Sequence, residues 1–554
     1  MELFNDTNNL LNVTPNNKNQ KRIFSLAIIA IFSVGFLVGI LPNLIAYPFP
    51  VGYDVVNYYI PITAKFDQHW SKISNQFPLY AFLLHLINIG TGLSPYCSVV
   101  ICASTMSGVF AISVFLLSRK ILNLSIKYSI FLSMFVIFQV AVLRTMWDLH
   151  RDLFTLSLMF IIFSLIYGNN RDGEEKKDEL KEVIDRTKLI SVSRLLQNHI
   201  VISDLSWKSI SIIASLIFLS ALTASADRMI GGLFTISLII YSFSIVRTKI
   251  SIVCASVALC FFIVAALPSY SIVTNGIFHE QELMTELKNP IIKSSSTSNM
   301  YSNNNNYSPT NLFVLFIVIT GSLLPTGIIG VKESFKRKNV LIIPLSIIII
   351  LSFSWIFFPH IESLAADRWI ILFGIFLSIF AGHGLIDLVQ RMKLASNSSS
   401  LLIKNYGKKI ILLSVLATFI VFGILYEVMP TNHPFVLYGI THNNIEGFVP
   451  LTMQINSIDI KDNQGLISAI SWINNSTEPN AIIMGEKHWR GFMELYLHGN
   501  RTFYFIDNFY SLINLLPQKD HVPIYMIKIS DYEDRNDNNI LHFANRFSVY
   551  RVEY

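Results

Sequence analysis

Residues 23–59 read IFSLAIIAIFSVGFLVGILPNLIAYPFPVGYDVVNYY, and this stretch sets the class of the fold. Its first part, residues 23–45, is an apolar run with the length that an α-helix needs to cross a bilayer, about 20 residues. Its second part places the carboxylate of Asp54 among tyrosines, which are typical of the membrane interface. The stretch predicts a retained membrane anchor followed by an acidic group at the membrane surface. Glycine and aspartate at positions 52 and 54 also fit an ordinary turn.

The composition is that of a membrane protein. Of 554 residues, 52% are hydrophobic and only 14% are charged, and the mean hydropathy is +0.50. Such a chain is too apolar for a soluble protein and long enough for many spans. The sequence predicts a polytopic α-helical membrane protein with about eleven transmembrane helices, at residues 23–45, 94–117, 124–143, 149–167, 208–225, 229–246, 250–267, 311–331, 339–358, 369–390 and 410–429.

The basic residues indicate the orientation of these helices. Most of the 42 lysines and arginines fall in loops on the same side as the N-terminal tail, residues 1–22. Because cytoplasmic loops are enriched in lysine and arginine, we expect a multi-pass protein of the cell membrane with a cytoplasmic N-terminus. The net charge of +6 is then explained by topology, and no nucleic-acid partner is predicted. The apolar segment 77–89 is too short for a span, so we expect an interfacial or half-buried helix there.

Three parts follow from this topology: a cytoplasmic tail (1–22), a transmembrane domain (23–429) whose first external loop covers 46–93, and an extracytoplasmic domain (430–554). The last part has the composition of a soluble domain. Short apolar runs predict strands at Ala481–Met484, Thr502–Ile506, Ile524–Ile529 and Ser548–Val552, alternating with helical stretches near 463–474, 489–498 and 508–516. We therefore expect a small α/β domain. The four cysteines lack CxxC spacing and nearby histidine pairs, which argues against a disulfide framework or a zinc site.

Ionisable side chains gather at the predicted outer ends of the helices. Residues 144–152, RTMWDLHRD, form a predicted second external loop. If a helix begins near Trp147, Asp148 and Asp152 lie on one face of it. Such residues at membrane depth are candidates for function, although Arg–Asp pairs that fix helix ends are an alternative. Two further Asp-Arg pairs open helices, and there the aspartates, Asp227 and Asp367, fit the role of N-caps.

The pattern resembles the GT-C superfamily of integral-membrane glycosyltransferases, which use lipid-phosphate-linked sugars. The branch it resembles is the protein O-mannosyltransferase and aminoarabinose-transferase group. The matching features are short motifs spread over most of the chain, followed by the C-terminal external domain: Gly52-Tyr53-Asp54, Phe77-Pro78-Leu79, Arg119-Lys120 and Arg151-Asp152-Leu153-Phe154.

The resemblance implies a glycosyltransferase that moves a hexosyl or pentosyl group from a polyprenyl- or dolichyl-phosphate donor to a hydroxyl of a protein, lipid or glycan. It implies that Asp54 is the general base, a role that a carboxylate beside an acceptor hydroxyl can perform. Asp152, or Asp148 as the second choice, would orient the partners of Asp54 or share a divalent ion with it. Magnesium or manganese suits oxygen ligands, but two acids do not establish a metal site. Arginine suits phosphate recognition, so the candidates for binding the donor phosphate are Arg144, His150, Arg151, Arg228 and Arg368.

Two other classes remain open from the sequence: a multi-pass transporter or lipid flippase, and a non-catalytic membrane scaffold. Transport pathways place ionisable residues near the bilayer midplane. Here the predicted spans are almost free of charge, and the charged residues gather at their outer ends. We therefore expect transfer chemistry at the outer face, with a lipid-linked sugar donor and membrane lipids as partners and an acceptor that the sequence does not identify.

Overall fold

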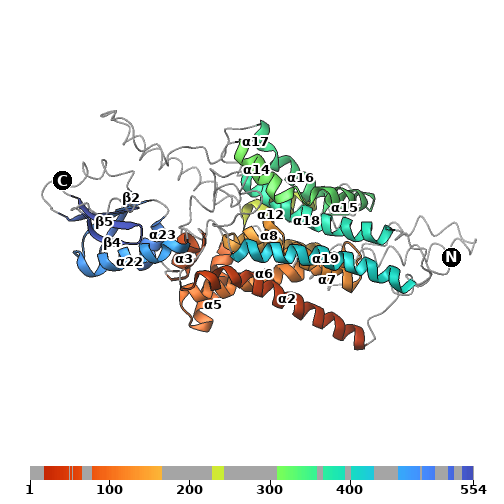
Figure 1. Ribbon diagram of the computed structural model, residues 1–554, viewed down its shortest axis with the longest axis horizontal. Helices are drawn as coiled ribbons and strands as arrows, with labels where there is room; N and C mark the ends of the chain where they lie inside the picture. The colour runs from red at the N-terminus through yellow and green to blue at the C-terminus, as the bar shows by residue number, and fades with distance from the viewer. Residues whose placement is uncertain are drawn as a thin grey trace, which may run out of the picture.

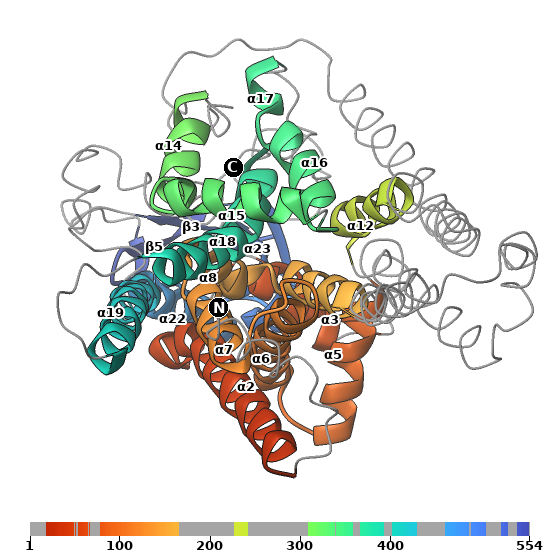
Figure 2. The same cartoon turned by 90° about the vertical axis from the view of Figure 1, so that its right-hand side faces the viewer.

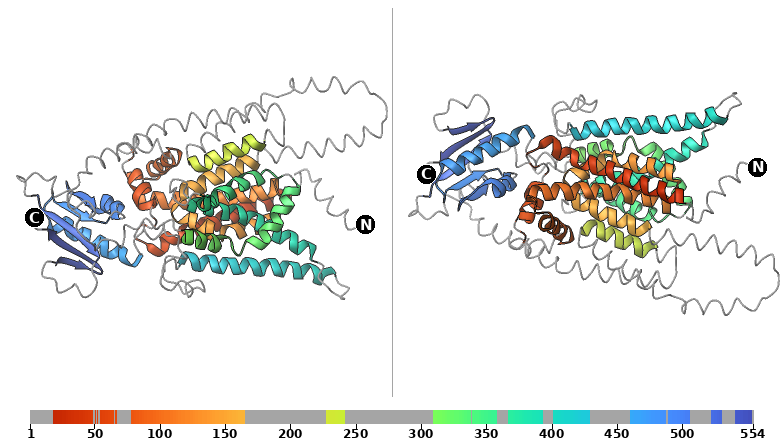
Figure 3. Two further views of the ribbon diagram at one scale, coloured as in Figure 1. Left: turned by 90° about the horizontal axis from the view of Figure 1, so that it is seen from above. Right: turned by 90° about the horizontal axis from the view of Figure 1, so that it is seen from below.

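The computed structural model describes residues 18–48, 50, 52, 54–64, 66, 78–164, 227–241, 309–337, 339–357, 366–392, 401–428, 460–486, 489–505, 522–529 and 540–552. A bundle of helices fills one end of the molecule, and a small α/β domain lies at the other (Figure 1). The views from above and below show the same separation, with α3 and α5 between the bundle and the sheet (Figure 3). This confirms the predicted class, a polytopic helical membrane protein with a small C-terminal domain.

The helical elements of the bundle and of the segment beside it are α2 (Lys18–Ala46), η2 (Val55–Tyr59), α3 (Ile60–Ala64), α5 (Pro78–Thr91), α6 (Pro95–Lys120), α7 (Ile126–Ile137), α8 (Val140–Asp148), α12 (Arg228–Tyr241), α14 (Pro309–Thr320), α15 (Leu324–Lys336), α16 (Ile342–Ser352), α17 (Ser354–Phe357), α18 (Ala366–Arg391) and α19 (Leu401–Val428). Residues 150–164 are helical as well. The local sequence explains where some of these helices begin. Before α6, for example, Ser94 accepts a hydrogen bond from the Cys97 amide and Pro95 occupies the first helical position.

Helix α18 is the centre of the bundle. Helices α7, α8, α14, α15, α16 and α19 pack around it (Figure 2). Its side chains are buried along almost its whole length, and between the charged residues near its two ends most of them are apolar. A helix with no polar face is expected to lie inside a bundle rather than on its surface.

Small residues let α15 and α18 approach closely. Backbone atoms of Phe380 occupy the space where Gly330 would carry a Cβ atom, and the carbonyl oxygen of Thr326 does the same at Gly384. Close contact through small residues is a common way to join helices in a membrane, where lipid removes the hydrophobic drive for association. The position of α18, and of the residues at its first turn, depends on this contact.

The described part of the chain contains four helices that are long and apolar enough to span a membrane, or up to six if each of two bent pairs counts as one span. The four agree with the predicted spans 23–45, 94–117, 369–390 and 410–429. The bent pairs, α7 with α8 (61°) and α14 with α15 (72°), fall on two further predictions. The predicted spans 208–225 and 250–267 lie outside the described residues. Helix α5 is short and apolar, as expected for the segment 77–89.

The segment around Arg144 differs from its prediction. We expected an external loop over residues 144–152, but α8 runs through Arg144 to Asp148. The chain turns earlier, at Phe138 and Gln139, where the Gln139 side chain donates to the Phe135 carbonyl and a new helix begins. Leu149 then leaves the helical conformation (φ −93°, ψ 46°). This break separates Asp148 from Asp152, so the expected single helix face carrying both is wrong.

The C-terminal domain contains a five-stranded sheet with the order β2-β1-β3-β5-β4. Its elements are α22 (Ile460–Ser476), β1 (Ile482–Gly485), α23 (Arg490–Tyr496), β2 (Thr502–Phe505), β3 (Ile524–Ile529), β4 (Ile540–Ala544) and β5 (Phe547–Val552). Strands β1, β2 and β3 are parallel, whereas β5 is antiparallel to β3 and to β4. The four predicted strands are present, and each of their ends lies within one residue of its predicted position. The predicted helix at 508–516 and the domain boundary at 430 lie outside the described residues.

Strand β4 was not predicted. It lies at the edge of the sheet, and its side chains are only partly buried, so the sequence lacks a clean apolar alternation there. The turn that joins it to β5 has Asn545 at a φ of 56°. Asparagine tolerates positive φ in a two-residue hairpin turn. The turn residue was therefore the only sequence signal for this hairpin.

Candidate active site

Asp54 lies in a short, tightly wound segment between the bundle and the C-terminal domain. Gly52 has a φ of 96°, which side chains with a Cβ atom rarely adopt, and its carbonyl accepts a hydrogen bond of 3.1 Å from the Val56 amide. The chain then forms a π-helical turn, η2, in which the Ile60 amide bonds to the Val55 carbonyl. Asp54 opens this turn with only 5% of its surface exposed. Wide turns of this kind occur frequently at functional sites.

The π-helical turn brings Tyr59 back beneath Asp54, five residues earlier. The Tyr59 hydroxyl donates to Oδ2 of Asp54 over 3.4 Å. Its ring is fully buried, stacked on His150 (centroids 5.5 Å apart) and edge-on to Tyr80 (5.0 Å). Tyr59 therefore fixes one oxygen of Asp54 from the side of the bundle. Tyr59 was not among the predicted site residues, because a spacing of five residues suits a π-helical turn rather than an ordinary α-helix.

A second segment brings Arg151 and Asp152 to the same place, at the start of the helix over residues 150–164. The Nε atom of Arg151 lies 3.6 Å from Oδ1 of Asp152 and 3.7 Å from Oδ2 of Asp227. Arg151 also interacts electrostatically with Asp54 and Tyr59. Buried charges are stable only when they are paired. This guanidinium group is paired with carboxylates from three separate segments of the chain.

Asp227 has two roles in the structure. Its Oδ1 accepts a hydrogen bond of 2.9 Å from the Ile230 amide, as expected for the N-cap of α12. Its other oxygen, Oδ2, faces Arg151, and its carboxyl group is in hydrogen-bonding contact with that of Asp152. Only the capping role was predicted from the sequence. The Asp-Arg pair at positions 227 and 228 was the available signal for the second role.

Arg368 enters from the first turn of α18. It interacts electrostatically with Asp152, Asp54, Asp227 and the like charge of Arg151. We call these five residues, Asp54, Arg151, Asp152, Asp227 and Arg368, the charged cluster. It contains three carboxyl groups and two guanidinium groups from four segments that are far apart in sequence. Asp54 and Asp152 thus share Arg151 and Arg368 as electrostatic partners.

The other predicted site residues lie around this cluster or outside the described part. Arg144 is buried on α8, where it interacts electrostatically with Asp367. His150 is 1% exposed, and its Nε2 atom lies 3.0 Å from the Met146 carbonyl. The side chains of Asp148 and Arg228 are outside the described part of the structure. Of the two acids, the structure describes the side chain of Asp152, which lies beside Arg151.

These residues do not fit a divalent cation. The described part of the chain contains no group of three histidine, cysteine, aspartate or glutamate side chains that could hold a metal ion. Asp54 and Asp152 would supply oxygen ligands to Mg²⁺ or Mn²⁺. Both acids, however, face Arg151 and Arg368, which already supply positive charge at this place. We therefore derive no chemical step through a metal.

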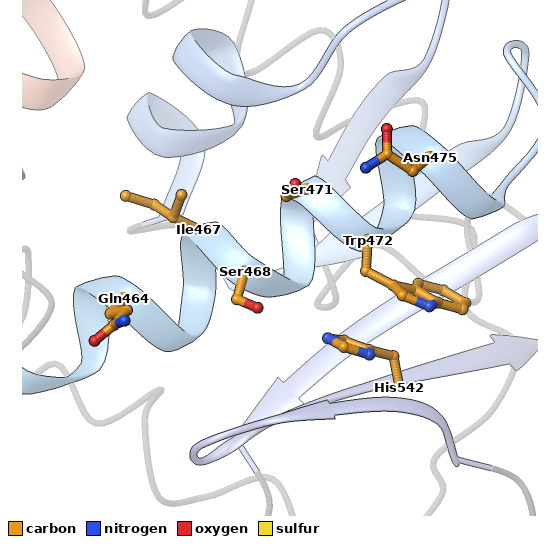
Figure 4. Close-up of a pocket in the computed structure, with 7 residues that line it drawn as sticks. All are labelled: Gln464, Ile467, Ser468, Ser471, Trp472, Asn475 and His542. Atoms are coloured by element: carbon orange, nitrogen blue, oxygen red, sulfur yellow. The ribbon is translucent and has the colours of Figure 1, made fainter.

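A groove of about 470 Å³ lies elsewhere, on the C-terminal domain (Figure 4). The rings of Trp472 on α22 and His542 on β4 stack in parallel at one end of it, 5.2 Å apart. Burial lowers the pKa of His542 below its ordinary value. Among the described residues, the groove is lined by uncharged polar and apolar side chains and one histidine: Gln464, Ile467, Ser468, Ser471, Trp472, Asn475 and His542.

The chain has the GT-C-like fold that was expected from the sequence, and it is a multi-pass membrane protein. ArnT from Cupriavidus metallidurans in the apo state is similar over 96% of this chain and 98% of its own, with a TM-score of 0.50 and 11% sequence identity. This similarity confirms the expected fold.

Two other solved structures are similar to this chain at lower TM-scores. ArnT from Cupriavidus metallidurans bound to undecaprenyl phosphate has a TM-score of 0.47 and 12% identity, covering 95% of this chain and 98% of its own. The arabinofuranosyltransferase AftD from Mycobacteria has a TM-score of 0.42 and 10% identity, covering 86% of this chain and 31% of AftD. No protein-family profile and no curated protein sequence matches the chain.

Proposed function

We propose that this protein is a glycosyltransferase that moves a sugar from a polyprenyl- or dolichyl-phosphate donor to an acceptor hydroxyl. The observation that supports this most is the convergence of Asp54 with Arg151 and Arg368 at the end of the bundle nearest the C-terminal domain. A carboxylate beside fixed guanidinium groups combines a proton acceptor with binding groups for a phosphate. The GT-C fold supports the same class of reaction.

In the proposed reaction Asp54 is the general base. The acceptor oxygen attacks the anomeric carbon of the sugar, and the bond from that carbon to the phosphate oxygen breaks. The proton of the acceptor hydroxyl passes to Asp54, and the electron pair of the broken bond leaves with the polyprenyl phosphate. A single displacement of this kind inverts the configuration at the anomeric carbon. The hydrogen bond from Tyr59 holds Oδ2 of Asp54, which directs the other carboxylate oxygen toward the acceptor.

The arginines stabilise the charge that develops on the leaving phosphate. Arg368, like Arg151, is partly exposed, and we assign it the first contact with the donor phosphate. Arg151 is held between Asp152 and Asp227, so its guanidinium group is fixed before the donor arrives. Pre-oriented donors of this kind cost no reorganisation during the reaction. Arg228 follows Asp227 in the sequence and is proposed as a third cation, whereas Arg144 and His150 support the site from within the bundle.

The finer assignments belong to the same proposal. The distribution of lysine and arginine supports a cytoplasmic N-terminus and an extracytoplasmic C-terminal domain, with the reaction at the outer face. Helix α2 begins at the end of the bundle far from the C-terminal domain, which is consistent with that orientation (Figure 1). The transferred group is a hexosyl or pentosyl group, and the acceptor is a protein, lipid or glycan hydroxyl.

Purified protein in lipid nanodiscs, incubated with labelled polyprenyl-phosphate hexoses and pentoses, tests the proposal. We expect transfer by the wild type and its loss in Asp54→Asn, which keeps the shape of the side chain but cannot accept the proton. Asp387→Asn is a matched control, because Asp387 pairs with Arg391 on α18, outside the charged cluster. Normal transfer by Asp54→Asn removes the assignment. Movement of intact donor across a vesicle membrane, without cleavage of its sugar-phosphate bond, would instead identify a flippase.

A further inference from the structure

Helix α23 of the C-terminal domain lies directly on the turn that carries Asp54. A Cβ atom placed on Gly491 would be 2.6 Å from both the carbonyl oxygen and Cγ1 of Val56, and 2.7 Å from its carbonyl carbon. Backbone atoms cannot move aside as a flexible side chain can. The absence of a side chain at Gly491 is therefore what allows α23 to touch the backbone two residues after Asp54.

The two bodies also share hydrophobic cores at this contact. Val56 belongs to the core of the C-terminal domain, where it packs with Trp489 and Phe492 among others. In the opposite direction, Leu495 of α23 packs against the cluster that contains Val55 and Tyr59. Val55 therefore anchors the π-helical turn in the cluster that contains Tyr59, and Val56 anchors it in the core of the C-terminal domain. Figures 1 and 3 show α23 and α3, which continues from this turn, side by side between the sheet and the bundle.

This arrangement holds Asp54 from two directions. On the side of the bundle, Tyr59 donates to its carboxylate. On the side of the C-terminal domain, α23 presses on the backbone of the same turn. A general base must lie within hydrogen-bond reach of the proton that it takes, and a shift of about 1 Å can cost about a hundredfold in rate.

We propose that Gly491 and Leu495 of α23 are positioning residues for Asp54, so that the C-terminal domain completes the active site rather than only covering it. The structural part of this proposal, that α23 fixes the turn over residues 54–64, stands on the contacts alone. Its catalytic consequence rests on the proposed function. The two parts are measured separately below.

The chain offers a matched pair of glycine substitutions. Gly491→Ala puts a methyl group into the contact with Val56. Gly465→Ala puts one into α22 of the same domain, 2.9 Å from the carbonyl oxygen of Ala544, and the three nearest atoms at this position belong to Ala544, Asn545 and Phe547, not to the Asp54 turn. Both changes introduce a steric clash in the C-terminal domain: Gly465→Ala with the backbone of Ala544, and Gly491→Ala with the backbone of Val56. Only the first strains the turn that carries Asp54.

Hydrogen exchange of the full-length protein in nanodiscs measures the structural part without any assay of activity. The Val56 and Ile60 amides bond to the carbonyls of Gly52 and Val55, so their exchange reports on the turn. We expect faster exchange of the peptide covering residues 54–64 in Gly491→Ala, and wild-type exchange there in Gly465→Ala. Unchanged exchange in Gly491→Ala, or equal acceleration in both variants, overturns the proposal.

A second pair of variants covers the case in which Gly491→Ala does not fold. Leu495→Ala removes packing on the cluster that contains Val55 and Tyr59, and on the core of the C-terminal domain, without introducing a clash. Ile467→Ala removes a partly buried side chain of similar size from the core of the same domain, on α22. Faster exchange over residues 54–64 in Leu495→Ala but not in Ile467→Ala supports the proposal, and the reverse pattern overturns it.

Steady-state transfer measures the catalytic part. We expect kcat to fall about 10- to 100-fold in Gly491→Ala, the size that a displaced base produces, with the donor KM within about twofold of the wild-type value because the arginines are untouched. Gly465→Ala should keep wild-type kcat. A rise in donor KM at unchanged kcat overturns the positioning role. If exchange responds as expected while the wild type shows no transfer with any donor, the positioning stands and the proposed function fails.

Discussion

Replacing Tyr59 with phenylalanine removes one hydroxyl group beside Asp54 and leaves the surrounding aromatic side chains in place. The ring of Tyr59 is fully buried between His150 and Tyr80, and phenylalanine keeps both ring contacts. The lost interaction is the hydrogen bond of 3.4 Å to Oδ2 of Asp54. The variant therefore separates the positioning of the carboxylate from the packing of the turn.

The length of that hydrogen bond sets the expected size of the effect. Hydrogen bonds to charged groups contribute about 1.5–3 kcal/mol, but the usual O–H···O distance is about 2.7–2.8 Å. Because this bond is 3.4 Å long, we place its contribution below that range, at about 1 kcal/mol. Since about 1.4 kcal/mol corresponds to a tenfold change in rate, kcat for sugar transfer should fall about fivefold in Tyr59→Phe.

Transfer from a labelled polyprenyl-phosphate sugar measures this effect, alongside two comparison variants. Tyr80→Phe removes a hydroxyl from the same hydrophobic cluster, beside Cys102 and not bonded to Asp54, so we expect wild-type kcat. Tyr59→Ala also empties the core, and buried aromatic-to-alanine changes cost about 3–5 kcal/mol of stability. If Tyr59→Phe transfers at the wild-type rate while Tyr59→Ala fails, Tyr59 only packs and the reasoning is refuted.

Three further predictions concern other parts of the chain. In Arg368→Ala the donor KM should rise about 10- to 100-fold, because one charge-assisted hydrogen bond to the phosphate is lost, while the acceptor KM stays constant. An equal rise in both KM values would indicate a structural role. Arg391→Ala is the control variant. Gly384→Ile should lower the melting temperature of the protein in detergent, because it forces α15 and α18 apart. Gly90→Ile should leave the melting temperature unchanged, because a Cβ atom at Gly90 has no neighbour within 4 Å. Arg501→Ala removes four hydrogen bonds to the end of α22 and its surroundings and should destabilise the C-terminal domain by about 2 kcal/mol; limited proteolysis measures this, and wild-type resistance would contradict it.

The class of the protein and most of its long helices follow from the sequence because they depend on local composition. An apolar run such as residues 23–45 has one stable conformation in a bilayer, since every backbone polar group must be bonded within the segment. The strands of the C-terminal domain were also readable, because each is a short apolar run bounded by turn residues. Strand β4 was missed because it lies at an edge and is stabilised by its partner β5 rather than by its own pattern.

The charged cluster was predictable in part. Asp54, Arg151, Asp152 and Arg368 stood out because ionisable residues at helix ends are costly in a membrane and must have partners. Which partners they have was not predictable from spacing. The expected helix face shared by Asp148 and Asp152 failed because the chain breaks at Leu149, and a break of one residue rotates everything that follows it.

By itself, the sequence determined that Asp54 follows a membrane helix and that acids and arginines gather at the ends of others. Only the tertiary structure decided that Tyr59 reaches back to Asp54, that Asp227 shares Arg151 with Asp152, and that Gly491 brings the C-terminal domain onto the turn at Val56. The physical reason is the range of the interactions. Hydrophobic length and capping act within one segment, whereas ion pairs and close backbone contacts join segments whose separation in sequence carries no information about their distance in space.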